Sequence, residues 1–256
     1  ETLSILPVDA IWMRLSGLGK EPGPQKARSL IRMLSGFHNM GKPVILDYCS
    51  GLNAEATEAF GLASGSASGI LELDQFNARD WHKPPEEPDP DAQFGRRSVV
   101  QVPGLGRGFY AHEFELLAKS RGGRKLLLQS EFVSVSSVEE MVKTRKQVQA
   151  LHLMRSQEAL QSVPDLNRAR HFLSKTMAGA ERRAKDVSFL KPTEAQAQAA
   201  GVDLPSLLKR TRGHAETMGK VADALERLHE ERGTESPRVR ACDFNVDIAL
   251  RRGDQR

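Results

Sequence analysis

The sequence predicts a mixed α/β protein, with a β/α domain over residues 1–137 and a mainly helical C-terminal region over residues 138–256. Two observations lead to this division. In the first part, short apolar runs alternate with helix-like patterns, which is typical of parallel strands joined by helices. In the second part, helical periodicity continues without a convincing strand until residues 241–250.

The chain is expected to open with a β-α-β-α-β unit. Its elements are expected at residues 10–16, 23–41, 43–48, 53–64 and 69–76. In the first helix, apolar side chains recur at spacings of three and four residues, Pro24 lies near the start and Gly41 follows the end. Asn53 is expected to cap the second helix.

A long loop is expected to interrupt the domain at residues 82–97, which are rich in proline and acidic residues. After this loop, the pattern predicts a strand at 98–106, a helix at 110–122 and a strand at 125–132. The last of these strands is predicted from the apolar run KLLLQSEF. The alternation of strands and helices is therefore expected to continue almost to the end of the domain.

Three long helices are expected in the C-terminal region, at residues 138–163, 165–187 and 203–231. Small and apolar side chains in the third helix step by four and three residues, which forms a seam for packing on neighbouring helices. Residues 139–256 hold 22 Lys and Arg against 17 Asp and Glu. Such an excess is typical of a protein with an acidic partner, nucleic acid first, and also of a solvated helical surface.

Composition excludes several classes of protein. No stretch approaches the roughly 20 consecutive apolar residues that cross a bilayer, so no membrane association is expected. The two cysteines, Cys49 and Cys242, are far apart and lack CxxC spacing. This spacing argues against a disulfide framework and a structural zinc site, and it is typical of a cytoplasmic protein. No metal and no cofactor are expected.

The residues that close the predicted strands are the first candidates for catalysis, because ligands of parallel α/β sheets bind at the carboxyl ends of strands. Carboxylates in one pocket can divide the acid and base roles when their surroundings separate their pKa values. The alternative is that these groups pair with one another or with solvent. The rule selects one cation and four carboxylates, which are Arg14, Asp47, Glu72, Asp74 and Glu131.

The glycine and serine run GLASGSASGI, residues 61–70, is a second feature of the first domain. Small residues let backbone N–H groups approach an anion, so the run is a candidate phosphate loop. It lacks the GxGxxG and GxxxxGK[ST] patterns and precedes a predicted strand instead of a helix. A helix stop followed by a tight turn is the favoured interpretation.

The C-terminal helices supply the candidates for binding a phosphate backbone. One segment, residues 193–213, has the pattern of a helix-turn-helix, with Ala197, Gly201 and Val202 at the expected positions. Pro205, just inside the second helix, favours a plain helix-loop-helix. The candidate nucleic-acid-binding residues are Lys143, Arg145, Lys146, Arg168, Arg170, Arg182, Arg183, Lys185, Lys209, Arg210 and Arg212.

The order of elements through KPVILDYCSGLNAEATEAFGLASGSASGILELDQF, then LLLQSEF, then the basic helices with VPDLNRARHFL, resembles the closing half of a tRNA-guanine transglycosylase. The resemblance covers residues 43–190 and implies a partial or complete TIM-barrel-like domain. It also implies that a strand-end carboxylate, Asp74 or Glu72, attacks the nucleoside. That family carries a cysteine-rich zinc site after the strands, whereas the corresponding stretch SEFVSVSSVEEM has no cysteine, so loss of the metal is implied.

Three functions are compatible with these patterns, in order of preference. The first is a nucleic-acid-associated protein that binds tRNA or DNA beside a transglycosylase-like domain, either active or catalytically decayed. The second is a barrel enzyme acting on a small phosphorylated or glycosidic substrate. The third is a scaffold subunit that binds a protein partner, or a second copy of itself, through its C-terminal helices.

Overall fold

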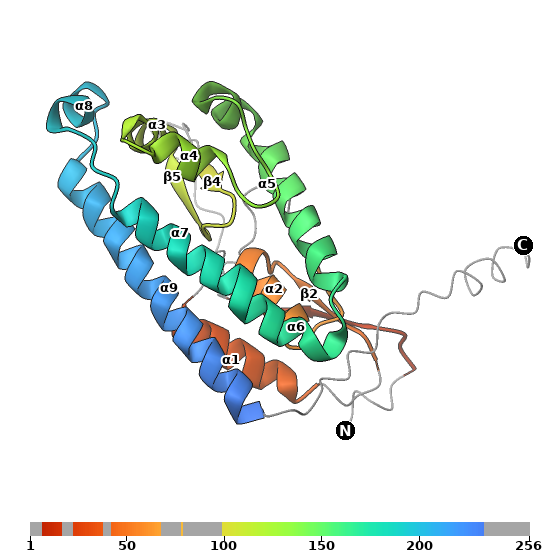
Figure 1. Ribbon diagram of the computed structural model, residues 1–256. Helices are drawn as coiled ribbons and strands as arrows, with labels where there is room; N and C mark the ends of the chain where they lie inside the picture. The colour runs from red at the N-terminus through yellow and green to blue at the C-terminus, as the bar shows by residue number, and fades with distance from the viewer. Residues whose placement is uncertain (1–6, 17–22, 38–41, 68–77, 79–98, 233–256) are drawn as a thin grey trace, which may run out of the picture.

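The computed structural model is a mixed α/β structure in which helices predominate, in agreement with the predicted fold class (Figure 1). The expected strands at 69–76 and 241–250 and the expected loop at 82–97 lie outside the residues that the structure describes. The described residues are 7–16, 23–37, 42–67, 78 and 99–232.

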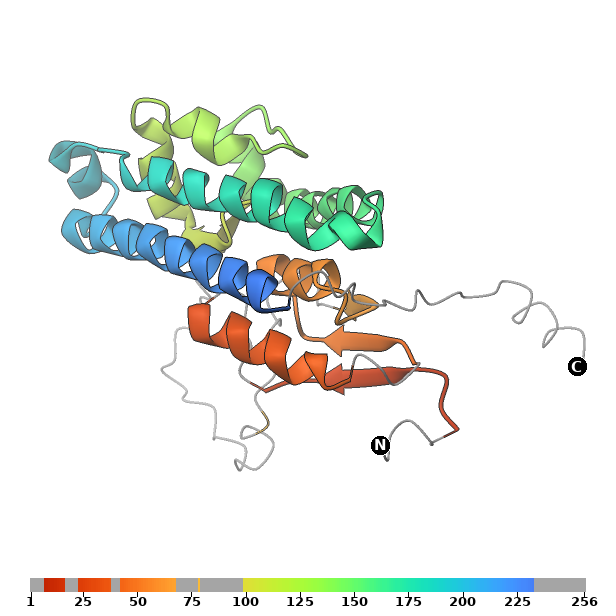
Figure 2. The ribbon, with the colours of Figure 1, turned by 60° about the horizontal axis from the view of Figure 1, so that its bottom comes forward.

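The first four elements of the predicted β-α-β-α-β unit are confirmed, whereas the third strand of the structure lies at Gly65–Ala67, before the segment 69–76 in which it was expected. The strands are parallel in the order β1-β2-β3, and Figure 2 shows both helices on the same side of this sheet. Such connections are the usual crossovers of parallel strands. The elements are β1 (Ile11–Arg14), α1 (Pro24–Ser35), β2 (Val44–Asp47), α2 (Gly51–Ala59) and β3 (Gly65–Ala67).

Helices α1 and α2 cover the sheet in different ways. Helix α1 begins at Pro24, and its apolar stripe, which includes Ile31 and Leu34, is buried. Helix α2 is buried from Leu52 to Ala59, so its polar side chains lie in the core as well. The prediction of Asn53 as N-cap was wrong, because the helix begins two residues earlier and Ser50 is the N-cap residue.

The two faces of the parallel sheet differ in composition. Residues directly opposite each other in register include Met13 with Leu46 and Arg14 with Asp47. Successive side chains of a strand point to opposite faces. Leu46 therefore points to the helices and is fully buried, whereas Trp12 lies on the opposite face and is 60% exposed. The charged strand ends belong to this second face, away from α1 and α2.

Residues 99–128 depart from the prediction in two places. The expected single strand at 98–106 is an antiparallel hairpin of β4 (Val99–Val102) and β5 (Arg107–Tyr110), because Gly104 and Gly106 turn the chain with φ angles of 73° and 68°. The expected strand at 125–132 was wrong. Its apolar run forms helix α4 (Gly123–Leu128), which follows α3 (Ala111–Lys119) after a tight turn. Short apolar runs do not distinguish a buried strand from a buried helix.

The three long helices of the C-terminal region are confirmed. The first is α5 (Val138–Gln161), and the third is α9 (Leu204–Arg232). The second is one continuous helical run composed of α6 (Asp165–His171), the π-helical turn η3 (Phe172–Met177) and α7 (Ala178–Ser188). A short helix, α8 (Glu194–Ala199), precedes α9.

Helix α9 joins the two parts of the chain. It lies between α7 and α1 in both ribbon views (Figures 1 and 2), and Arg32 of α1 pairs with Glu231 at 3.1 Å. Buried side chains from both parts, such as Leu34 and Met218, belong to one hydrophobic cluster. The domain division at residue 137 stays a prediction.

The strands described here form a three-stranded sheet and a separate hairpin, not a closed barrel. A TIM-barrel-like closure therefore stays a prediction. Within the described residues, no helix combines the length and the apolar character needed to cross a membrane.

Candidate functional site

The carboxyl end of the parallel sheet carries an ion pair. Arg14 donates to Asp47 Oδ2 through Nη2 at 2.7 Å and through Nε at 2.9 Å, and its guanidinium lies 4.9 Å from the centre of the Tyr48 ring. Burial alone would raise the pKa of Asp47. Hydrogen bonds from Arg14, Trp12 and the Tyr48 backbone, together with the charge of Arg14, hold this pKa below its ordinary value. The pair ties β1 to β2.

Replacing Asp47 with asparagine is expected to lower the free energy of unfolding by no more than about 1 kcal/mol. The reason is that partly exposed ion pairs contribute little to stability, and the Arg14 side chain is 39% exposed. Urea denaturation near neutral pH checks this expectation, with Arg14→Gln as the reciprocal variant. A loss of several kcal/mol in either variant would show that the pair is a main determinant of the fold.

The other strand-end candidates do not join this pair. Glu72 and Asp74 lie outside the described residues. Glu131 was selected as the end of a strand, but that segment is helix α4 and the loop after it. Glu131 is exposed and does not lie at the sheet; it lines the small cavity that is described below. The structure thus brings Arg14 and Asp47 together and places Glu131 elsewhere.

The glycine and serine run forms a turn and then β3. Gly61 follows the end of α2 with a φ of 69°, which agrees with the favoured interpretation as a helix stop. Ser66 of β3 donates to Glu58 Oε1 at 2.8 Å, and Gln157 of α5 donates to the same oxygen at 3.4 Å. Burial raises the pKa of Glu58, and these hydrogen bonds oppose the shift. The run therefore connects the sheet to α2 and α5.

A small cavity that is partly open to solvent lies between α2, the β4–β5 turn, the loop after α4, α5 and the η3–α7 segment. Its volume is about 150 Å³. Since a water molecule takes about 30 Å³ of liquid volume, the cavity has room for about five waters or one small functional group. Polar side chains from distant parts of the sequence line it, including Glu55, Ser130, Gln149, His152, Ser156, Lys175 and Arg183.

Glu55 is the buried acidic group of this cavity, which the exposed Glu131 also lines. Glu55 lies in the middle of α2 and is 4% exposed. Burial raises its pKa to about 7, a hydrogen bond from Ser156 opposes the shift, and the charge of Glu58 adds to it. Near neutral pH, Glu55 is thus divided between the carboxylic acid and the carboxylate, which is the state expected of a proton donor in catalysis.

His152 is the basic group of the cavity. Its Nδ1 lies 3.4 Å from Ser130 Oγ, and the Phe132 ring packs on it with a centroid distance of 5.7 Å. Burial, and then the charge of Arg183, lower the pKa of His152 to about 4. The imidazole is therefore neutral at pH 7 and can accept a proton. Ser130 also accepts the backbone N–H groups of Phe132 and Val133, so its hydroxyl holds both the loop and the ring.

Two side chains of the cavity wall keep polar atoms without hydrogen-bond partners. Arg183 donates through Nη2 to the carbonyls of Leu126 and Gln129, which lie at the end of α4, but its Nε is buried and unpaired. Gln149 Oε1 is buried and unpaired in the same way. Burial lowers the pKa of Arg183, and Asp186 opposes the shift. Buried polar atoms without partners are uncommon in folded proteins, and they are frequent at functional sites.

Sequence reasoning missed Glu55 and His152. Helix α2 is buried on all sides, so its sequence shows no polar face that would single out Glu55. For His152 a signal was present, since the buried stripe of α5 steps by four residues from Val148 through His152 and Ser156 to Leu160. Two polar residues in the middle of a buried stripe are a departure from the usual pattern of core helices.

Five of the predicted nucleic-acid-binding cations are engaged within the protein. Arg183 holds the end of α4, as described above. Arg168 pairs with Asp165 at 2.7 Å and donates to the carbonyls of Val163 and Gln161. The remaining contacts are those of Arg145 with the Val142 carbonyl, Lys185 with Glu181, and Arg210 with Glu113.

The other six predicted cations are exposed and make no ion pair or hydrogen bond with the described residues. They are distributed over α5, α6, α7 and α9, of which α7 and α9 lie side by side (Figure 1). These residues are Lys143, Lys146, Arg170, Arg182, Lys209 and Arg212.

The segment 193–213 folds as a helix-loop-helix made of α8 and the start of α9. Gly201 turns the chain with a φ of 63°, Val202 N donates to the Ala197 carbonyl at 3.0 Å, and Ala197 is buried. The local geometry that the pattern predicts is thus present. It does not by itself identify a DNA-binding element.

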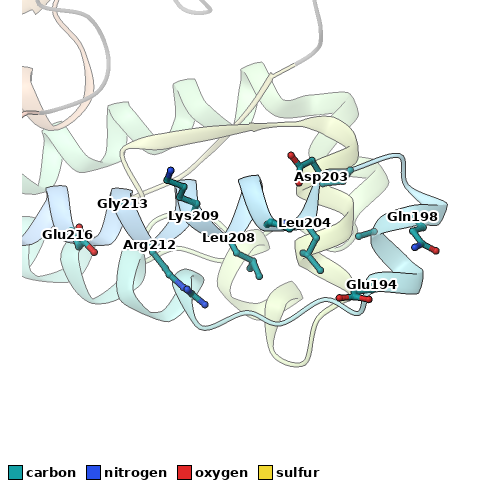
Figure 3. Close-up of a pocket in the computed structure, with 12 residues that line it drawn as sticks. Glu194, Gln198, Asp203, Leu204, Leu208, Lys209, Arg212, Gly213 and Glu216 are labelled. Atoms are coloured by element: carbon teal, nitrogen blue, oxygen red, sulfur yellow. The ribbon is translucent and has the colours of Figure 1, made fainter.

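An open groove of about 940 Å³ runs along this helix-loop-helix (Figure 3). Its lining includes Leu204 and Leu208, and the side chains of Lys209 and Arg212 point away from each other in the view. Three carboxylates line the same groove, so the two cations are outnumbered there; the acids are Glu194, Asp203 and Glu216. The groove therefore lacks the positive surface that a phosphate backbone requires.

Comparison with known proteins found no relative of this chain. No family model matches the chain, and neither a curated protein nor a solved structure is found to be similar to it. The cavity must therefore be interpreted from its own chemistry.

Proposed function

We propose that the protein is an enzyme that hydrolyses a small phosphorylated substrate by general acid and base catalysis in the small cavity beside α2 and α5. The observation that supports this proposal is the pairing of Glu55 and His152 in one small space. Their surroundings move their pKa values in opposite directions, to about 7 and about 4. Titratable groups with pKa values separated in this way are typical of acid–base sites.

The two groups have complementary roles near pH 5 to 6, between the two pKa values. His152, as the neutral imidazole, takes a proton from the water that attacks phosphorus. Glu55, as the carboxylic acid, gives its proton to the ester oxygen as the P–O bond breaks. Orthophosphate and an alcohol leave, and the proton on His152 returns through solvent to Glu55.

The positively charged side chains that line the cavity favour a phosphorylated substrate over a glycosidic one. Three cations, Lys175, Arg107 and Arg183, line the cavity against two carboxylates, Glu55 and Glu131. Lys175 is exposed and makes no ion pair with a carboxylate of the described residues. Cations near the reacting phosphoryl group stabilise its negative charge. The volume of about 150 Å³ holds a phosphate group and one or two waters.

The test is release of inorganic phosphate from 4-nitrophenyl phosphate, glycerol 3-phosphate and ribose 5-phosphate. Glu55→Gln and His152→Asn are each expected to lower kcat/KM by a factor of about 100 or more. The pH profile of the wild type is expected to be bell-shaped, with limbs near pH 4 and pH 7, because His152 must be neutral and Glu55 protonated.

The matched control is Glu216→Gln, which makes the same chemical change on the exposed face of α9. It is expected to keep the wild-type rate. Hydrolysis that survives in both cavity variants, or no hydrolysis of any of the three esters, would refute the proposal.

The transglycosylase-like activity stays a prediction, because its candidate nucleophiles Asp74 and Glu72 lie outside the described residues. Binding of nucleic acid by the predicted basic helices also stays a prediction, as does a role as an assembly scaffold. The exposed cations Lys143, Arg170 and Arg212 belong to three different helices, α5, α6 and α9.

A further inference from the structure

A compact group of cations lies on the turn between α3 and α4, at a place that none of the candidates above includes. Four of the seven residues from 119 to 125 are cationic, and none is acidic. We call Lys119, Arg121, Arg124 and Lys125 the basic turn. All four are exposed, and none makes an ion pair or hydrogen bond with the described residues.

The backbone of the basic turn is closely packed against α3. Gly122 has a φ of 79°, and Gly123 N donates to the Ser120 carbonyl at 2.9 Å. A Cβ atom on Gly123 would overlap the carbonyl oxygen of Leu117, so the second glycine lies directly against the end of α3. The turn therefore holds its four cations on a fixed backbone, which lowers the entropy cost of binding a ligand.

The basic turn borders an open cleft of about 830 Å³. Lys119, Arg124 and Lys125 line this cleft together with Ser120, whose Oγ is buried and has no hydrogen-bond partner. An unused hydroxyl group thus lies beside three cations. Such a combination is suited to phosphate oxygens, which accept hydrogen bonds and carry negative charge.

Carboxylates do not cancel this charge. Glu115 and Glu139 line the same cleft, and the three cations that line it, Lys119, Arg124 and Lys125, outnumber them. Glu139 also lies in the first turn of α5, where negative charge interacts favourably with the helix. The net charge of the region is positive, in contrast to the groove along α8 and α9.

We infer that the basic turn binds the phosphodiester backbone of a nucleic acid. The cleft is open, and the cations are spread along a turn instead of converging on one point. A polyanion can contact several of them at once, whereas a single phosphate group cannot. Binding of this kind gains its free energy from counterion release and is independent of base sequence.

The test is fluorescence anisotropy of a labelled single-stranded DNA and of the corresponding duplex, titrated with the full chain from low to physiological salt. The double variant Arg124→Glu with Lys125→Glu is expected to bind at least about tenfold more weakly at low salt. The slope of log Kd against log salt is expected to fall in magnitude by about 2.

The matched control is Lys220→Glu with Arg227→Glu, which changes the net charge equally at two exposed cations of α9 that are not among the predicted binding residues. It is expected to bind within about twofold of the wild type. Far-UV circular dichroism and thermal melting check that both double variants are folded.

Three results would overturn the inference. The first is absence of binding by the wild type at low salt. The second is an equal loss of affinity in the control variant, which would indicate general attraction to a positively charged protein. The third is displacement of the DNA by inorganic phosphate more strongly than by chloride at the same ionic strength, which would indicate a site for free phosphate.

Discussion

The Glu55→Gln variant is expected to become more stable than the wild type as the pH rises, by about 3 kcal/mol between pH 4.5 and pH 8. The pKa of Glu55 is raised from 4.5 in the unfolded chain to about 7 in the folded protein. In this range the unfolded state loses a proton that the folded state keeps, so the Glu55 contribution to stability falls as the pH rises. Glutamine cannot ionise and removes this loss. One pKa unit corresponds to about 1.4 kcal/mol.

His152 is expected to give the opposite slope. Its pKa is lowered from 6.5 to about 4, so the unfolded state binds a proton that the folded state lacks, and stability rises with pH over this interval. In the wild type the two contributions nearly cancel. In Glu55→Gln only the contribution of His152 remains, so the stability of this variant is expected to rise with pH. In His152→Asn only the contribution of Glu55 remains, so its stability is expected to fall with pH.

Urea denaturation of the wild type and both variants, at a series of pH values from 4 to 8, measures these slopes. The difference between each variant and the wild type removes the contributions of all other titrating groups. Parallel curves for the three proteins would mean that Glu55 and His152 have ordinary pKa values. In that case the assignment of acid and base roles in the cavity would lose its support.

The Gly123→Ala variant is expected to lose about 3 kcal/mol or more of stability. The added methyl group would overlap the carbonyl oxygen of Leu117, which is backbone and cannot rotate away. Relief of the overlap requires α3 and α4 to separate, although Leu117 and Leu127 of these helices are buried in the core. The cost therefore includes both strain and lost packing.

Gly122→Ala is the matched control for this prediction. Gly122 has open space around the position of a Cβ atom, but its φ of 79° is unfavourable for alanine. A cost of about 1 kcal/mol is expected from the backbone alone. Thermal and urea denaturation of the two variants compare these effects, and similar losses in both would show that Gly123 is not closely packed.

Local sequence patterns correctly predicted the helices and strands in which the spacing of apolar residues shows which face is buried. Helix α1 is an example, because its buried residues Leu30 and Leu34 share one face and Pro24 marks its start. The elements decided by tertiary contacts were missed. The run after Lys125 is too short to show a period, and it is helical because Gly122 turns the chain and Gly123 packs it against α3.

The residues of the candidate site were harder to predict from the sequence than the helices and strands, because tertiary structure brings them together. Asp47 was correctly expected at a strand end, since a strand end can be located from its own segment. Glu55 and His152 lie 97 positions apart in the sequence, one on the buried helix α2 and the other on the buried stripe of α5, and only the fold brings them to one cavity. Their altered pKa values come from this burial, which no local pattern encodes.

The position of α9 has a consequence for the order in which the protein can fold during synthesis. Helix α1 contacts α9, and Arg32 and Glu231 are 199 residues apart. At a translation rate of about 5 to 20 residues per second, α1 waits on the order of ten seconds or more for its partner to be made. Its apolar face is open to solvent or to chaperones during this interval. The native core of the first part of the chain is therefore completed last, when nearly the whole of this sequence has left the ribosome.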